Sequence, residues 1–270
     1  MTDSVQLLGI SNAIVDVLAH VDYEFLDTLG APPGSMTLID RERALEVYDM
    51  MGPATEMSGG SVANTVAGFA NLGGNAAYIG NVRDDQLGAI FNHDMKSLGV
   101  DIRLEPATEG LPTARCHVLV TEDGQRTMLT YLGACTELAL GDITEETVRA
   151  PKCILLEGYV WDIADGPALA IKAAEIGHAN GSKVAISLSD SFCVERHRDA
   201  FEDYVRNYAD IVVADEDEAH ALVGTQSFDE LLPKLQAYGN LFAVTRLTGV
   251  ASCVTTWSPC TMTDPFSERV

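Results

Sequence analysis

Short apolar runs alternate with longer amphipathic segments through most of this chain, and that order limits the fold more than any other feature. A short apolar run is typical of a strand buried on both faces, and the segments between the runs have helical spacing. The order predicts an α/β doubly wound, mostly parallel sheet with helices on both faces. The expected strands are residues 6–10, 76–80, 153–157, 183–188, 211–214 and 241–245, and the expected helices are residues 41–51, 62–72, 86–98, 166–179, 195–208, 216–223 and 228–238.

Three of the expected helices follow a residue that can cap them. Ser61, Asp85 and Asp215 each precede a helical segment and carry a side-chain oxygen. Such an oxygen can accept a hydrogen bond from the unpaired N–H groups of the first turn. We therefore expect these three residues at the N-caps.

Two regions interrupt the α/β order with alternating, strand-like residues. They are residues 16–22 with 35–40, and residues 114–121 joined to 126–132 by a turn. The second region is typical of a β-hairpin. Four extra strands predict a small β lid above the carboxyl edge of the sheet, where open α/β sheets bind ligands. We expect one domain over residues 1–246, with lid strands inserted at about 16–40 and 113–132.

Composition excludes some classes of function. The chain of 270 residues has a formal net charge of -23 and 47% hydrophobic residues, as in a globular protein. Such a negative charge repels nucleic acids and anionic membrane surfaces, so we expect neither as a partner. No secretory signal or apolar stretch of membrane-spanning length is evident, which predicts a cytoplasmic location. The six cysteines show no zinc-ligand spacing, and most are expected to be reduced core thiols.

Polar residues at two chain turns are candidates for ligand binding. Asn12 and Asp16 follow the first strand, and an amide with a carboxylate suits the vicinal hydroxyls of a ribose-like ring. The alternative is an Asx turn that only ends the strand. Gly59 and Gly60 precede a helix whose first turn contains Asn64, so backbone could approach a ligand there. The alternative is a flexible left-handed connection with no ligand.

The order of these motifs resembles the ribokinase (PfkB) family over most of the chain. Residues 80–85 (Gly-Asn-Val-Arg-Asp-Asp) complete the pattern, although Arg83 stands where many members have glycine. The resemblance implies a kinase that transfers the γ-phosphoryl group of ATP to a primary hydroxyl of a nucleoside or sugar, with Mg²⁺. It also implies that Asn12, Asp16, Gly59, Gly60 and Asn64 hold the acceptor, with the diglycine as the hinge of the lid.

Residues 11–16, 126–128 and 187–192 look most like the adenosine-kinase branch of the family. By that likeness Ile14, Met128 and Leu132 would form an apolar wall against a purine. The alternative is that they are ordinary core residues.

The nucleotide side of the resemblance lies further along the chain. Residues 215–218 (Asp-Glu-Asp-Glu) resemble the family's Asn-Glu-x-Glu motif, with Asp215 in place of Asn. The resemblance implies that Asp215, Glu218 and Thr245 contact the nucleotide and that Glu218 organises magnesium through water. The alternative is a capped, solvated helix N-terminus.

The family's catalytic motif, Asp-Thr-x-Gly-Ala-Gly-Asp, does not occur in the sequence. Its last Asp removes the proton of the acceptor hydroxyl, and its backbone N–H groups hold developing negative charge. Residues 247–270 have neither helical nor strand periodicity and resemble a frameshifted or disordered tail. We therefore expect a C-terminally truncated kinase with little activity, or a catalytically inactive ligand-binding remnant. A dinucleotide-dependent oxidoreductase is disfavoured because the first strand lacks a G-x-G-x-x-G turn, and the lid strands could pair into a homodimer.

Overall fold

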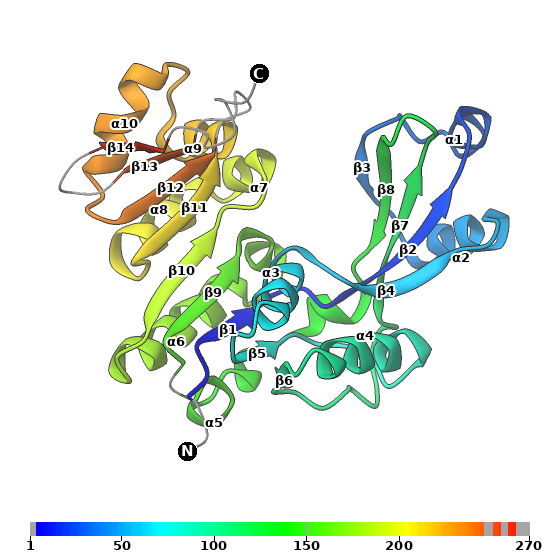
Figure 1. Cartoon of the computed structure of the whole chain (residues 1–270), viewed down its shortest axis with the longest axis horizontal. Helices are drawn as coiled ribbons and strands as arrows, with labels where there is room; N and C mark the ends of the chain where they lie inside the picture. The colour runs from blue at the N-terminus through cyan, green and yellow to red at the C-terminus, as the bar shows by residue number, and fades with distance from the viewer. Residues whose placement is uncertain (1–3, 150, 246–250, 255–258, 263–270) are drawn as a thin grey trace. The chain divides into compact units, whose positions relative to one another are not determined.

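The computed structural model describes residues 4–149, 151–245, 251–254 and 259–262 (Figure 1). The chain forms two compact units. Unit 1 comprises residues 1–10 and 139–270, and unit 2 comprises residues 11–138. Each unit is described by itself.

Unit 1 contains a largely parallel sheet in the order β14-β13-β12-β11-β10-β9-β1. Strands β1, β9, β10, β11 and β12 pair in parallel, and β13 and β14 continue the sheet as antiparallel strands. The strands are β1 (Leu7–Ile10), β9 (Cys153–Glu157), β10 (Lys183–Ser187), β11 (Ile211–Asp215), β12 (Leu241–Thr245), β13 (Ala251–Val254) and β14 (Pro259–Met262). Every parallel strand falls on an apolar run expected from the sequence.

Helices connect the parallel strands of unit 1. They are α5 (Glu145–Val148), α6 (Gly166–Ala179), α7 (Ser191–Arg196), α8 (Arg198–Asn207), α9 (Glu216–Val223) and α10 (Phe228–Gln236). The helix expected over residues 195–208 is wrong in its extent, because α7 already begins after Asp190, whose side chain accepts from Cys193 N. The helix is interrupted at His197 before α8 begins.

Strands β13 and β14 lie within the range 247–270, and the rest of that tail lies outside the described residues.

Unit 2 contains the predicted lid, a mixed sheet in the order β3-β8-β7-β2-β4. Its strands are β2 (Ile14–His20), β3 (Met36–Leu38), β4 (Thr55–Gly59), β7 (Ala114–Val120) and β8 (Arg126–Tyr131). The sequence predicted four lid strands and missed β4. Residues 55–59 (Thr-Glu-Met-Ser-Gly) contain no apolar run, because this edge strand of the sheet is mostly half-buried or exposed.

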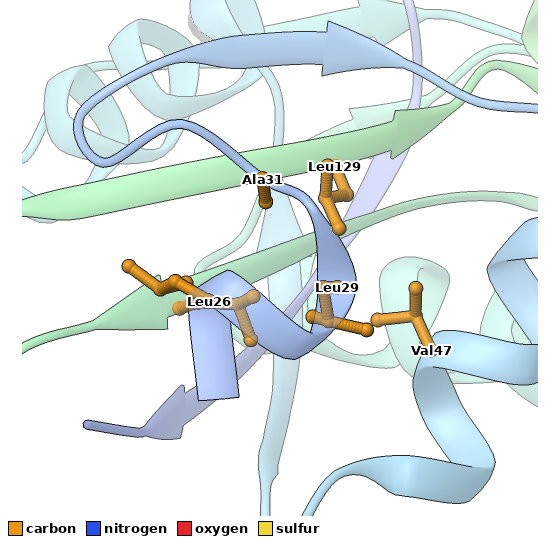
Figure 2. Packing of buried hydrophobic residues seen from close by; sticks show 6 residues of the cluster. Leu26, Leu29, Ala31, Val47 and Leu129 are labelled. Atoms are coloured by element: carbon orange, nitrogen blue, oxygen red, sulfur yellow. The ribbon is translucent and has the colours of Figure 1, made fainter. Parts of the chain in front are cut away.

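One face of the lid sheet, here called the helix face, is covered by α1 (Tyr23–Leu29) and α2 (Arg41–Met50). Leu129 of the sheet packs with Leu26 and Leu29 of α1 and Val47 of α2 (Figure 2). Leu119 of the sheet belongs to the same cluster. These side chains are buried, and their removal from water stabilises the lid by about 25 cal/mol for each Å² of apolar surface. This packing joins both helices to the lid sheet.

The remainder of unit 2 comprises α3 (Ser61–Asn71), α4 (Gln86–Ser97), and the parallel strand pair β5 (Ala76–Ile79) and β6 (Asp101–Ile102). Asp85 caps α4 as expected, since its Oδ1 accepts from Gly88 N at 2.9 Å. The prediction for Ser61 is wrong. Ser61 is the first residue of α3, and Gly60 occupies the N-cap with no side-chain bond. In the described part of the chain, no helix is long and apolar enough to cross a bilayer.

Candidate functional site

The turn from the lid into α3 brings Asp16 and Gly59 into close contact. Asp16 lies on β2, and Gly59 ends the neighbouring strand β4, where its Cα partner is Ile14. A Cβ atom on residue 59 would overlap the carboxyl carbon and both carboxyl oxygens of Asp16. Glycine at this position therefore makes room for the Asp16 carboxyl group.

Gly60 makes a second close approach, to the backbone of Asn12. A Cβ atom on residue 60 would lie 2.7 Å from Asn12 O, and the φ angle of 104° is one that residues with a Cβ rarely adopt. Gly60 O accepts from Asn64 N at 2.9 Å and so begins α3. The structure thus brings Asn12, Asp16, Gly59 and Gly60 together, with Asn64 exposed on the first turn of the adjoining helix.

The Asp16 carboxyl group lies in a poorly hydrated place. Burial raises its pKa to about 6, and the positive charge of Arg126 partly opposes this shift. Near neutral pH the group is largely ionised, and a carboxylate accepts hydrogen bonds from two vicinal hydroxyls. Arg126 begins β8 and had no assigned role in the sequence interpretation.

The three apolar residues predicted to face a purine differ in whether they lie on the same sheet face as Asp16. Ile14 is half-buried and lies on the same sheet face as Asp16, two residues away on β2. Met128 shares that face because the register pairs it with Val118, and Val118 with Leu18. We call this surface the Asp16 face. Leu132 is half-buried just beyond the end of β8, where its carbonyl accepts from Cys135 N.

The predicted nucleotide residues lie in unit 1 at the carboxyl ends of β11 and β12. Asp215 and Thr245 are Cα partners there, and both are exposed. Asp215 Oδ1 accepts from Glu218 N at 2.7 Å, and Glu218 Oε2 accepts from Asp215 N at 3.0 Å. This reciprocal arrangement is a capping box. Residues 215–218 therefore cap a helix, and this capping does not conflict with a role in nucleotide binding.

Glu218 is buried, and its pKa is raised to about 7, first by burial and further by the charges of Asp215, Asp190 and Asp217. The sequence interpretation gave no role to two further acidic residues: Asp190, which caps α7 and acts on Glu218, and Glu157, which is buried at the end of β9. Glu157 could have been found as a carboxylate that ends an apolar strand. These carboxylates also raise the pKa of Tyr159, although burial is the larger cause.

The described residues contain no group of three or more His, Cys, Asp or Glu side chains placed to hold a metal ion. Glu218 already accepts a backbone hydrogen bond through one oxygen. The described residues thus form no cage of protein ligands, so a magnesium ion near Glu218 would have to be contacted through water.

The comparison with known families addresses the whole arrangement. The model of the family described as "pfkB family carbohydrate kinase" matches residues 36–253, which is well over half of the chain. This chain belongs to the PfkB family. That match confirms the resemblance seen in the motifs, and the α/β ribokinase-like fold with a parallel main sheet and a mixed lid sheet is confirmed as well.

Solved structures of PfkB relatives cover nearly all of the chain. An adenosine kinase from Sinorhizobium meliloti is 44% identical with a TM-score of 0.89, over 99% of this chain and 82% of that one. A probable sugar kinase protein from Rhizobium etli is 43% identical with a TM-score of 0.87, over 95% of this chain and 78% of that one.

Among curated PfkB relatives, guanosine-inosine kinase from Escherichia coli K12 is 24% identical over 234 residues, which is 83% of this chain. The matched region spans 54% of that relative, so the chain covers about half the length of the curated protein it matches.

Proposed function

We propose that this protein is an ATP-dependent phosphotransferase that transfers the γ-phosphoryl group of ATP to a primary hydroxyl of a nucleoside, adenosine-like, or of a sugar. The observation that carries the proposal is the contact of Asp16 with Gly59 beside Asn12 and Gly60. It places an ionisable carboxylate, a buried amide and a helix N-terminus around one turn. Such a group of donors and acceptors suits a ring with vicinal hydroxyls.

The form of the Asp16 face supports a nucleoside as the acceptor. A ribose held at Asp16 would have Ile14 on the same face and Met128 two strands away, so an attached base would meet apolar side chains. The relatives named above act on nucleosides or are described as sugar kinases. We assign the acceptor role to Asn12, Asp16, Gly59, Gly60 and Asn64, and base contact to Ile14, Met128 and Leu132.

The nucleotide role is assigned to Asp215, Glu218 and Thr245 in unit 1. ATP would bring Mg²⁺, which neutralises phosphate charge during the transfer. Burial raises the pKa of Glu218 to about 7, and in its ionised form Glu218 would accept a hydrogen bond from a metal-bound water. Asp215 fixes the position of Glu218 through the capping box.

A second candidate is a catalytically inactive protein that binds the acceptor. The observation that favours it is that the sequence contains no Asp-Thr-x-Gly-Ala-Gly-Asp segment to supply the catalytic base and anion hole. Binding at the Asp16 face does not need that segment. Turnover does need a base on the nucleophile.

Calorimetry with adenosine, ribose and fructose, together with an ATP turnover assay on the same preparation, tests both candidates. Saturable binding of adenosine with phosphate transfer supports the kinase. Binding that Asp16→Ala abolishes, without transfer, supports the inactive binder. Absence of binding by all three compounds contradicts both.

Two further assignments belong to this proposal. Met36, Leu38 and Met57 are large apolar side chains exposed on the outer strands of the lid sheet, and we propose that the lid strands pair in a homodimer. Light scattering on Leu38→Glu compared with the parent chain tests this, because a lid dimer should dissociate. A cytoplasmic location is likewise proposed, and neither nucleic acid nor membrane is proposed as a partner.

A further inference from the structure

A cavity lies between α2 and α4 of unit 2. Its volume is about 590 Å³, which falls within the range of roughly 300–1,000 Å³ that is usual for small-molecule sites. The end of α2, the connection to β4, β4 itself and α4 all contribute to its wall. The lining side chains are those of Tyr48, Met51, Pro53, Ala54, Glu56 and Ile90.

The cavity lies on the opposite side of the lid sheet from Asp16. The register pairs Glu56 on β4 with Val17 on β2. Paired residues point to the same face and successive residues of a strand point to opposite faces, so Glu56 is on the face that Asp16 does not share. That is the helix face, on which α2 packs. The cavity is therefore separate from the proposed acceptor site.

One carboxylate stands in a wall that is otherwise mostly apolar. Glu56 is half-buried, and its Oε1 accepts from the Tyr48 hydroxyl at 3.1 Å. A carboxylate has further acceptor positions beyond the one that a single donor uses. Apart from Tyr48, the other lining side chains are apolar. A ligand in this cavity would meet one negative charge and a large apolar surface.

The Tyr48 ring is held from two directions. Its hydroxyl donates to Glu56, and its ring meets the buried His117 of β7 edge-on, with the centroids 6.3 Å apart and the planes at 83°. Tyr48 is nevertheless 43% exposed, so part of the ring is open to a ligand. The face of an aromatic ring attracts a cation through its quadrupole. Tyr48 and Glu56 thus favour the same sign of charge.

The charges around the cavity are mostly negative. The charge of Glu56 is the main cause that raises the pKa of the Tyr48 hydroxyl, and the opposing effect of Arg115 is smaller. Asp94 of α4 accepts from Ser58 N at 2.8 Å, two residues along β4 from Glu56. A second carboxylate therefore lies near the cavity, in a chain whose formal net charge is -23. Such a field draws in cations.

We propose that this cavity is a second ligand site, which takes an organic ammonium ion with an apolar body. The Glu56 carboxylate binds the ammonium group, the Tyr48 ring lies against the positive charge, and the apolar lining covers the rest of the ligand. A bare metal ion does not fit, because the described residues that line the cavity include one carboxylate and no group of three metal-ligating side chains. The site does not depend on the proposed kinase function.

Three indole compounds of similar size test the charge preference. At pH 7.5 tryptamine is an ammonium ion, tryptophol is neutral and indole-3-propionate is an anion. Calorimetry at about 0.15 M salt, which screens long-range attraction, should show that tryptamine binds about tenfold more tightly than tryptophol. Indole-3-propionate should not bind. Equal affinities for tryptamine and tryptophol, or no saturable binding of tryptamine, would overturn the proposal.

Variants of the two polar lining residues test their roles. Glu56→Gln should weaken tryptamine binding about fivefold and leave tryptophol unchanged, since the amide oxygen still accepts from Tyr48. Tyr48→Phe keeps the ring and should retain the affinity for tryptamine, whereas Tyr48→Leu should lose it severalfold. A loss in Tyr48→Phe equal to that in Tyr48→Leu would contradict the role of the ring.

Asp49→Asn is the matched control for Glu56→Gln. It removes one negative charge from α2 at an exposed position next to Tyr48 that does not line the cavity. Tryptamine affinity should change by less than about twofold. Equal losses in the two variants would show attraction by the general field in place of a site, and would overturn the proposal.

The last test places the ligand. Ala54→Phe fills the cavity from an exposed lining position and should abolish tryptamine binding, with thermal unfolding to check that the variant is folded. Excess adenosine should not displace tryptamine from the parent chain. Tryptamine that still binds to Ala54→Phe, or that adenosine displaces, would lie at another site and the proposal would be wrong.

Discussion

Gly59 lies directly against the carboxyl group of Asp16, with no space left for a Cβ atom. Gly59→Ala should therefore displace the carboxyl group. Because the site would be overpacked, the variant should be about 1–3 kcal/mol less stable than the parent chain. It should also bind adenosine at least about tenfold more weakly, which corresponds to about 1.4 kcal/mol. Thermal unfolding and calorimetry measure the two effects.

Gly68→Ala is the control for this change. Gly68 lies within α3, and a Cβ atom there would have no heavy atom within 4 Å. Alanine in place of glycine inside a helix stabilises by about 0.5–1 kcal/mol, and binding should stay unchanged. Equal loss of binding in both variants would contradict a specific role for the Gly59 contact.

Asp16→Asn should have opposite effects on stability and binding at pH 8. The pKa of Asp16 is raised from 3.8 to about 6 in the folded chain, so its contribution to stability is full below pH 4 and is lost as the pH rises through 6. The neutral amide should thus stabilise the protein at pH 8 by up to about 3 kcal/mol, less any solvent screening, and by little at pH 4.

Denaturant unfolding at the two pH values measures this difference. The same variant should lose adenosine affinity at pH 8, because an amide has one acceptor oxygen where the carboxylate has two. A variant that is less stable than the parent at pH 8 would show that Asp16 is not strained by burial.

Asp215→Ala should destabilise the protein by about 1 kcal/mol, since it removes the N-cap of α9. Asp215→Asn retains the cap and removes one of the charges that raise the pKa of Glu218. We therefore expect unchanged stability, and severalfold tighter binding of a magnesium complex of a non-hydrolysable ATP analogue, measured by calorimetry at pH 7.

Asp217→Asn is the matched control for that variant. Asp217 lies on the same first turn and also raises the pKa of Glu218, although less than Asp215 does. Its effect on nucleotide binding should be smaller. Tighter binding in Asp217→Asn than in Asp215→Asn would argue against Asp215 as the nearer charge to the phosphates.

His117→Leu should remove an acid sensitivity of the lid. His117 is fully buried on β7, and neither of its ring nitrogens has a hydrogen-bond partner among the described residues. Burial lowers the pKa of His117 to about 4, and the positive charge of Arg115 contributes to this shift. Since the unfolded chain binds the proton more tightly, His117 costs stability as the pH falls below 6.5. The loss is about 2 kcal/mol between pH 7 and pH 5.

The variant should be more stable than the parent at pH 5, and the gain should shrink at pH 7. Urea unfolding at both values measures it. His93→Leu is the control for replacing a histidine at the surface, because the His93 side chain is 82% exposed. A gain that is equal at both pH values would indicate a packing effect in place of the titration.

The strands of unit 1 could largely be predicted from the sequence, because parallel strands buried on both faces consist of short runs of apolar residues. Cys153–Glu157 and Leu241–Thr245 were expected with the bounds they have. Strand β4 was not predictable in this way, because its pairing with β2 depends on backbone hydrogen bonds that do not require apolar residues. At the break between α7 and α8, His197 bonds Asp162 at 2.7 Å, a contact between distant parts of the sequence that local patterns do not reveal.

The candidate site likewise has some features that local sequence signals predict and others that depend on contacts between distant segments. Asn12, Asp16 and the two glycines could be named from the sequence because a strand end and a Gly-Gly turn are local signals. Their contact could not, since it depends on the pairing of β2 with β4 across more than thirty residues of chain. Arg126, whose charge lowers the pKa of Asp16, is further away still along the chain and lies on β8 of the lid sheet.

The division into units also bears on how specificity could change over time. All the candidate acceptor side chains belong to unit 2, which is one uninterrupted stretch of chain, whereas unit 1 is assembled from two stretches. Two crossovers in the coding sequence, near codons 11 and 138, would exchange all the proposed acceptor-binding residues between family members. Asp215, Glu218 and Thr245, which we propose contact the nucleotide, would be inherited intact, so a lineage could acquire a new acceptor by recombination and keep its phosphate donor.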